Sequence, residues 1–134
     1  MLRCLGLGSL LILLSISAAD AQGGLYTEEQ ARKGEAAYDA NCATCHGAEL
    51  RSADREVPNL SDRWFRSGWI GKTVAEKFEM IRDTMPPKEP HSLDDQVYLD
   101  IGAHILRFNK IPAGEKTLVP GSGLKQLTIP APPG

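Results

Sequence analysis

Two cysteines and a histidine stand together in the segment Cys42-Ala43-Thr44-Cys45-His46. Cysteines three positions apart on a helical turn face the same way, so their sulfurs can bond to the two vinyl groups on one edge of a porphyrin. The histidine that follows can then point its ring at the iron. Cys-x-x-Cys-His is the attachment signature of c-type haem, and it predicts one covalently attached haem c.

Three other chemistries compete for the cysteine pair. A thioredoxin-like thiol site would need a βαβ context, which this sequence lacks. A zinc site would need two further ligands at suitable spacing, and besides His46 the chain offers His91 and His104. A structural disulfide between Cys42 and Cys45 is the third alternative.

An iron bound by His46 has a second axial position on the opposite face of the haem. Met85 is the first candidate, because it follows an expected helix and precedes Pro86-Pro87, which hold its backbone extended. Histidine–methionine ligation raises the reduction potential relative to more basic ligand pairs. His91, in a loop, is the main rival. The other side chains able to bind iron lie within expected helices and are Met80 and His104.

A capped helix is expected directly before the cysteine pair. Thr27 and Gln30 have the spacing of a capping box, so the helix should run from about Glu28 to Ala40. Gly34 lies within it, where glycine costs about 1 kcal/mol relative to alanine. Its presence indicates that another helix approaches closely at this point.

Further helices are expected after the cysteine pair. A short one is expected at about 61–66. A second capping box, Thr73 with Glu76, begins another. The last helix, capped by Ser92 or Asp94, reaches about residue 108 and has apolar side chains at near-helical spacing. With no convincing strand, the predicted fold is all-α, with three or more helices whose long loops wrap the haem.

The N-terminal segment 1–21 has the pattern of a secretory signal peptide. Arg3 gives a positive start, an apolar run covers residues 5–16, and Ala19-Asp20-Ala21 is a small-x-small cleavage site. The run is too short to span a bilayer comfortably, and an uncleaved anchor is the alternative. We therefore expect a periplasmic protein, with no membrane insertion after cleavage.

The length of 134 residues predicts one domain, which we place at residues 22–111. Residues 112–134 contain five prolines and four glycines and predict an extended tail, laid on the surface or partly disordered. The net charge of -2 is too small to indicate binding to nucleic acid or to an anionic membrane.

Residues 28–111 resemble the small class I cytochrome c family. The resemblance implies the class I cytochrome c fold, and a hydrogen bond from His46 to the carbonyl of Pro58, which fixes the ring orientation. The family's C-terminal helix often carries an aromatic residue where this chain has His104, which is expected to take its place in packing. The matching segments are Gly34 with Tyr38, residues 42–47, Pro58-Asn59-Leu60, Thr84-Met85-Pro86-Pro87 and residues 98–108.

A closer subgroup is suggested by Trp64-Phe65, Trp69, Thr73 and residues 109–114. This pattern is similar to cytochromes that accompany periplasmic quinoprotein dehydrogenases for sugars or alcohols. The resemblance implies a dehydrogenase as electron donor and an oxidase or another cytochrome as acceptor. Trp69 is expected to donate its indole N–H to a haem propionate, with ordinary core packing as the alternative.

Electron transfer is the expected function, because an iron with both axial positions filled is not easily reached by small molecules. The protein is then not an enzyme, although it can be a subunit of a dehydrogenase complex. A haem enzyme or a gas sensor with a displaceable sixth ligand is the alternative. Residues 51–88 carry eight basic and six acidic side chains, a mixture that indicates no particular partner.

Overall fold

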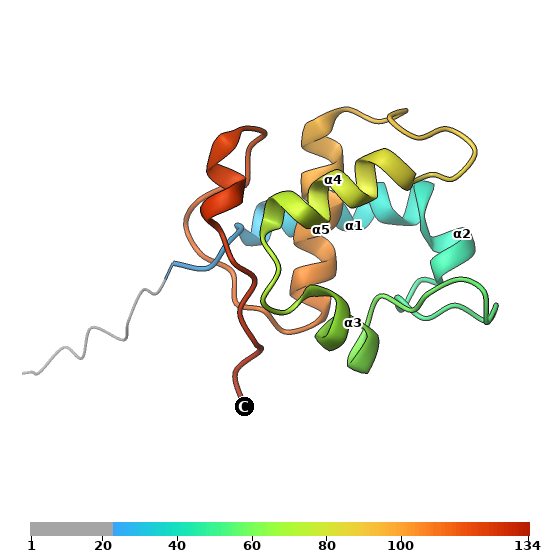
Figure 1. The fold of residues 1–134 in the computed structure, drawn as a ribbon, viewed down its shortest axis with the longest axis horizontal. Helices are drawn as coiled ribbons and strands as arrows, with labels where there is room; N and C mark the ends of the chain where they lie inside the picture. Colours follow the sequence, from blue (N-terminus) through green and yellow to red (C-terminus); the bar gives the residue numbers. More distant parts are fainter. Residues whose placement is uncertain (1–22) are drawn as a thin grey trace, which may run out of the picture.

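The computed structural model describes residues 23–134, so the predicted signal peptide lies outside the described residues. The elements, in chain order (Figure 1), are α1 Glu28–Asn41, α2 Ala43–His46, α3 Asp62–Trp69, α4 Val74–Thr84, α5 Asp95–Phe108 and the 3-10 helix η1 Ser122–Gln126. Over residues 23–134, β pairing is limited to an isolated antiparallel bridge between Thr73 and Thr128. Within the same residues no helix combines the length and the apolar character needed to cross a bilayer. The predicted all-α fold is confirmed.

The crossing of α1 and α5 is the most extensive contact between two helices. A Cβ atom on Gly34 would collide with the carbonyl oxygen of Asp100, so the two backbones touch where the glycine predicted a close approach. The rings of Tyr38 and His104 pack together with their centroids 5.1 Å apart. His104 thus occupies the position of the expected aromatic.

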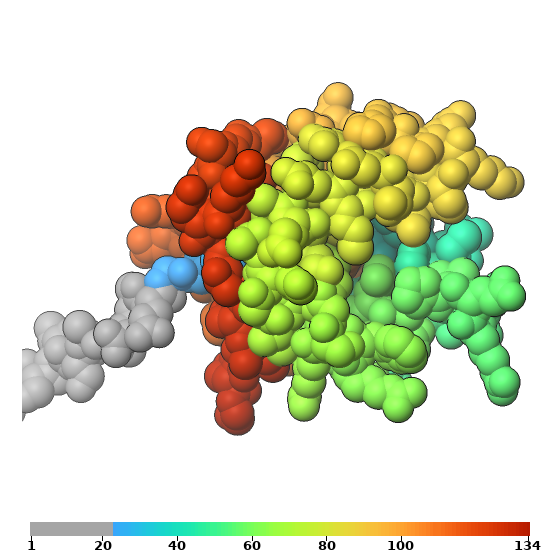
Figure 2. Space-filling view, in the orientation of Figure 1, coloured from blue at the N-terminus to red at the C-terminus, as the bar shows by residue number. Residues whose placement is uncertain are grey.

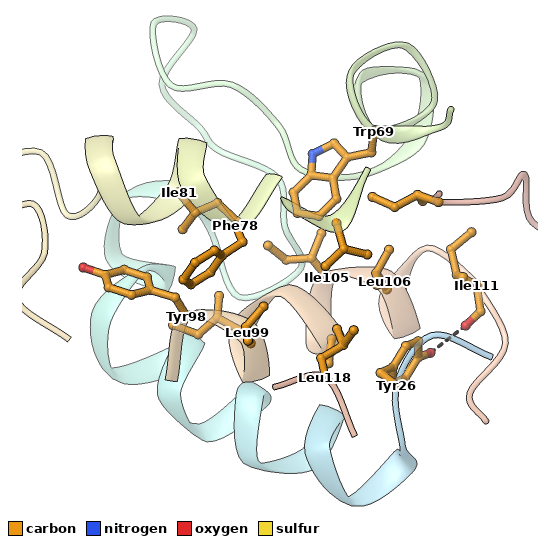
Figure 3. Close-up of a cluster of buried hydrophobic side chains, with 14 of the residues drawn as sticks. Tyr26, Trp69, Phe78, Ile81, Tyr98, Leu99, Ile105, Leu106, Ile111 and Leu118 are labelled. Atoms are coloured by element: carbon orange, nitrogen blue, oxygen red, sulfur yellow. Dashed lines mark hydrogen bonds between the residues drawn. The ribbon is translucent and has the colours of Figure 1, made fainter. Parts of the chain in front are cut away.

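The apolar core lies between α4, α5 and the C-terminal segment. Figure 3 shows Phe78 and Ile81 of α4 directed towards Tyr98 and Leu99 of α5. Each of these four side chains is at least nine-tenths buried. Because α5 packs against both α1 and α4, it is the central element of the fold.

The segment after residue 111 differs from the predicted surface tail. Its apolar side chains Leu118, Leu124 and Ile129 are 3%, 4% and 1% exposed and belong to the core. Much of the segment is extended, as proline and glycine predict, but η1 interrupts it. The composition therefore predicted the irregular backbone correctly. It did not predict that three apolar side chains of this segment would be buried in the core.

The two predicted capping boxes turn out differently. At α4 both halves form, because Thr73 accepts from the amide of Glu76 and Glu76 accepts from the amide of Thr73. At α1 only the Thr27 half forms. The side chain of Gln30 is buried instead, where it donates to the carbonyl of Leu118 at 2.9 Å and accepts from its amide at 2.8 Å.

Candidate haem site

His46 ends α2, a helix of only four residues that follows α1 directly. Its ring is 7% exposed, and its Nδ1 lies 3.0 Å from the carbonyl oxygen of Pro58. Because a carbonyl only accepts, Nδ1 carries a proton, and in the neutral imidazole the lone pair is then on Nε2. Nε2 makes no hydrogen bond to any residue of 23–134, so it is free to bind a metal. The hydrogen bond lies where the family resemblance placed it.

The loop between α2 and α3 holds Pro58 in position. The amide of Leu60 donates to the carbonyl of Leu50 at 2.8 Å, and the amide of Ser52 donates to the side-chain oxygen of Asn59 at 2.8 Å. From the end of α5, Asn109 donates to the carbonyl of Leu60 at 2.9 Å. The partner of His46 is therefore fixed by its own loop and by a distant helix.

Both cysteines of the motif are free thiols in the structure, so Cys42 and Cys45 do not form the disulfide considered as an alternative. Cys42 is half-buried and Cys45 is exposed. Burial, together with the neighbouring Cys45, raises the pKa of Cys42 to about 11. A redox-active thiol or a zinc ligand acts as the thiolate, which this environment disfavours. Residues 23–134 also hold no group of three or more His, Cys, Asp or Glu side chains able to bind a metal.

Met85 caps the C-terminal end of α4, directly after Thr84. Its amide still bonds to the carbonyl of Ile81 at 2.8 Å, while its own backbone is extended, with φ -127° and ψ 146°. Its carbonyl accepts a hydrogen bond of 2.9 Å from the phenol of Tyr98. Met85 is half-buried against the core. Its backbone is bonded to α4 through Ile81 and to α5 through Tyr98. Figure 1 places α2 and the C-terminal end of α4 at the same end of the long axis.

The rival sixth ligands are placed differently. His91 is exposed and lies 3.4 Å from the carboxylate of Asp83. Met80 points outwards and is 42% exposed. His104 is 4% exposed, with its ring between those of Tyr38 and Phe108. Of the four candidates, Met85 alone is both partly accessible and packed against the core.

Trp69 ends α3 and is 5% exposed, with its ring stacked on Phe65 at a centroid distance of 5.5 Å. The ammonium of Lys77 lies 5.6 Å from the centroid of the indole. Figure 3 shows the indole nitrogen on the side of the ring away from Ile105 and Leu106. Its N–H donates to no described residue. The ring thus packs in the core, while the N–H has no partner within residues 23–134, so both the propionate bond and packing alone stay open.

Two tyrosines near the site have functions that the sequence did not reveal. Tyr98 fixes the carbonyl of Met85, and Tyr38 donates to the carbonyl of Gly47 at 2.8 Å, which fixes the turn after His46. Both bonds join residues from different elements, so no local pattern predicts them. In the sequence, Tyr98 stood out only as the first residue of the segment 98–108, which resembles the family's C-terminal helix.

The arrangement fits a c-type haem. It offers two free thiols, an imidazole whose Nε2 has no partner within 23–134, a partly buried thioether and an unused indole N–H. Figure 2 shows the surface hollowed between α4 and the green segment that follows α2. The residues that would hold the group are Cys42, Cys45, His46, Met85 and Trp69.

Comparisons with known proteins agree with this chemistry. The family described as "Cytochrome C oxidase, cbb3-type, subunit III" matches residues 29–105, more than half of the chain. Among solved structures, the sulfane dehydrogenase SoxCD from Paracoccus pantotrophus is similar, with a TM-score of 0.58 and 22% identity. That match covers 95% of this chain and 69% of the other, and at this identity it shows a shared fold. No curated protein matches.

Fold, motif and family match now point the same way, to haem c binding and to electron transfer with redox partner proteins. The match to residues 29–105 includes both cysteines, His46 and Met85. The chain therefore belongs to the family of the cbb3-type cytochrome c oxidase subunit III and is a class I c-type cytochrome.

Proposed function

We propose that this protein carries single electrons through one covalently attached haem c, between a dehydrogenase and a respiratory acceptor in the periplasm. The observation that carries the proposal is the buried ring of His46. It follows the free cysteine pair directly, and the carbonyl of Pro58 orients it through a bond of 3.0 Å. A histidine oriented by its second nitrogen is the usual arrangement at a metal site.

Each residue of the site has one task in this proposal. Cys42 and Cys45 form thioethers, which retain the cofactor in a compartment where released haem would be diluted away. His46 would hold the iron through Nε2, and Met85 would hold it through its sulfur. The bound group supplies an iron that cycles between the ferrous and ferric states. Trp69 donates its N–H to a propionate.

The hold on Met85 supports electron transfer over substrate chemistry. A thioether is a poor ligand unless it is kept in place, and here the phenol of Tyr98 fixes the carbonyl of the same residue. With His46 and Met85 both holding the iron of a bound haem, other molecules would be kept from it. A haem enzyme or gas sensor would need one of these ligands to leave.

The partners are proposed from three observations. The motif Trp64-Phe65 with Trp69 resembles cytochromes that accompany quinoprotein dehydrogenases for sugars or alcohols, which suggests such a donor. The structural relative is itself a dehydrogenase, and the family is named after an oxidase subunit, which suggests an oxidase as acceptor. The signal-like segment 1–21 supports export.

Covalent haem in the exported protein tests this proposal. The protein is purified from the periplasm and extracted with acid–acetone, which removes haem that is not covalently bound. We expect one haem per chain to remain, and Cys45→Ser to impair attachment or maturation. Loss of all haem from the wild-type protein, or full attachment through both vinyl groups in the Cys45→Ser variant, would contradict the proposal. Finding the intact N-terminus in the cytosol would contradict export.

A further inference from the structure

Among the exposed side chains of α3 are Arg63, Trp64 and Arg66, which we name the α3 ridge. Trp64 is 51% exposed, which is unusual for so large an apolar side chain. The guanidinium of Arg63 lies 5.3 Å from the centroid of its indole ring. Tryptophan and arginine are the residue types that dominate the binding energy of protein interfaces.

A hollow lies on each side of the α3 ridge. One, of about 410 Å³, is lined by Trp64 and by the loop residues 52–59. The other, of about 690 Å³, is lined by Phe65 and Arg66 of α3 and by Phe108 and Lys110 at the end of α5, among others. In Figure 1, α3 lies at the lower side of the molecule, together with the end of the C-terminal segment. A helix between two hollows presents a shape that projections of another protein can fit.

The charges that remain unpaired on this face are largely positive. Asp62 is paired with Arg51 at 2.5 Å. Within residues 23–134, the cationic groups of Arg55, Arg63, Arg66 and Lys110 make no ion pair, and on the negative side neither do the carboxylates of Asp54 and Glu56 beside Trp64. Since the whole chain has a net charge of -2, this face differs from the average surface. A complementary partner carries carboxylates around an apolar centre.

The α3 ridge is also linked to the iron ligand. Trp64 and Pro58 line the same hollow, and the carbonyl of Pro58 bonds to the ring of His46 at 3.0 Å. A protein docked on Trp64 therefore rests against the segment that orients the histidine.

We propose that the α3 ridge docks a redox partner protein whose surface presents carboxylates around an apolar projection. This inference rests on the proposed electron-carrier function. With haem bound, one electron would pass in the docked complex from the partner's reduced group to ferric iron, leaving the partner oxidised by one electron and the iron ferrous, or in the reverse direction when the partner is the acceptor. An anionic membrane fits less well, because a flat bilayer leaves both hollows beside the α3 ridge empty.

The test uses the haem-loaded protein and the soluble and membrane fractions of its source organism. The rate of haem reduction or oxidation by each fraction is followed by absorbance at low and high salt. One of the two fractions exchanges electrons with the wild-type haem faster than the other. We expect Trp64→Ala and the double variant Arg63→Ala/Arg66→Ala each to lower the rate with that fraction at least ten-fold at low salt. The double variant should also lose most of the salt dependence. Immobilised wild-type protein should deplete the electron-exchanging activity from that fraction, and immobilised Trp64→Ala should not.

Matched controls remove an equally exposed apolar group or an equal charge elsewhere. Met80→Ala on α4 and Lys116→Ala/Lys125→Ala in the C-terminal segment should stay within two-fold of the wild type. Unchanged absorbance spectra and reduction potentials show that the variants are folded and loaded. Should Trp64→Ala fail to fold, the double arginine variant decides the question alone.

Two results would overturn the docking surface. One is that the ridge variants exchange electrons within two-fold of the wild type. The other is that vesicles of anionic phospholipid bind the wild type but not Trp64→Ala, which would assign the ridge to a membrane. A wild-type protein that exchanges electrons with neither fraction would contradict the proposed function itself.

Discussion

At the scale of single residues, the ring of His46 is oriented from outside its own helix. α2 is only four residues long, so the ring depends on a carbonyl from the following loop. The five-residue motif was sufficient to predict which residues gather here, because its spacing is local. The Pro58 contact came from family resemblance, and the phenol of Tyr98 was missed because it reaches Met85 only through the tertiary fold.

The hydrogen bond of Tyr98 predicts how firmly Met85 is held. Tyr98→Phe removes a bond worth about 1 kcal/mol, so imidazole added to the ferric protein should displace the methionine about five-fold more easily. Spectrophotometric titration with imidazole measures this. Tyr26→Phe is the matched control, because its phenol also donates to a carbonyl, that of Ile111, at 2.6 Å, and it should leave the titration unchanged. Equal imidazole affinity in the wild type and Tyr98→Phe would contradict the role of Tyr98.

His104 predicts a pH-dependent stability. Neither of its ring nitrogens has a hydrogen-bond partner, and burial lowers its pKa below the ordinary 6.5, with Arg107 lowering it and Glu35 and Asp39 opposing the shift. The unfolded chain takes up the proton at higher pH than the folded chain does. The contribution to stability is therefore complete above about pH 6.5 and is lost as the pH falls below it.

Replacing His104 with an aromatic residue tests this dependence. The unfolding free energy of His104→Phe minus that of the wild type should grow on acidification, by at most about 1.4 kcal/mol per pH unit below 6.5. Urea unfolding of both proteins at pH 7.5 and pH 5.5 measures this difference. Taking the variant minus the wild type removes the effect of other titrating groups, because both proteins contain them. If the difference in unfolding free energy were the same at both pH values, His104 would gain a proton as easily in the folded chain as in the unfolded chain, contrary to this prediction.

At the scale of elements, local signals located the helices well. The helix expected at about 61–66 is longer, Asp62–Trp69, and the capping box at Thr73 forms as predicted. Gln30 departs from its local role because a buried amide gains more from binding the backbone of Leu118 than from completing a cap. Competition of this kind depends on a segment 88 residues away, which no local window contains.

The α1–α5 crossing predicts opposite effects for two helical glycines. Gly34→Ala should lower the unfolding free energy, because the new Cβ collides with the backbone of Asp100. Gly68→Ala in α3 meets nothing within 4 Å and should raise it by up to about 1 kcal/mol through helix propensity. Denaturant unfolding of both variants measures the changes, and destabilisation by Gly68→Ala or tolerance of Gly34→Ala would be inconsistent with the crossing.

At the scale of the whole molecule, the C-terminal segment completes the core. Proline and glycine predicted an irregular chain, but the docking of Leu118, Leu124 and Ile129 depends on a surface that exists only once α4 and α5 have packed. The residues directly before α1 are tied to the same region, since the amide of Gly114 donates to the carbonyl of Tyr26 at 2.6 Å. The segment after residue 111 is thus a structural part of the cytochrome fold.

This view predicts the effect of truncating one anchor. Leu124→Ala should lower the unfolding free energy of the whole protein by about 2–5 kcal/mol, because a buried side chain is lost. Val119→Ala, at a position 59% exposed, should change it by less than about 0.5 kcal/mol. Circular dichroism and haem absorbance should report the same transition. A loss in Leu124→Ala no larger than in Val119→Ala would indicate that the segment is only an appendage.

The central claim is that Met85 and His46 bind the same iron, and the ferric absorbance spectrum of the purified protein tests it most directly. Ligation by methionine predicts a low-spin spectrum with the weak far-red band of sulfur-to-iron charge transfer. Met85→Ala should keep the haem attached, lose that band and lower the reduction potential. A high-spin ferric spectrum in the wild type, or an unchanged band and potential in Met85→Ala, would contradict the account.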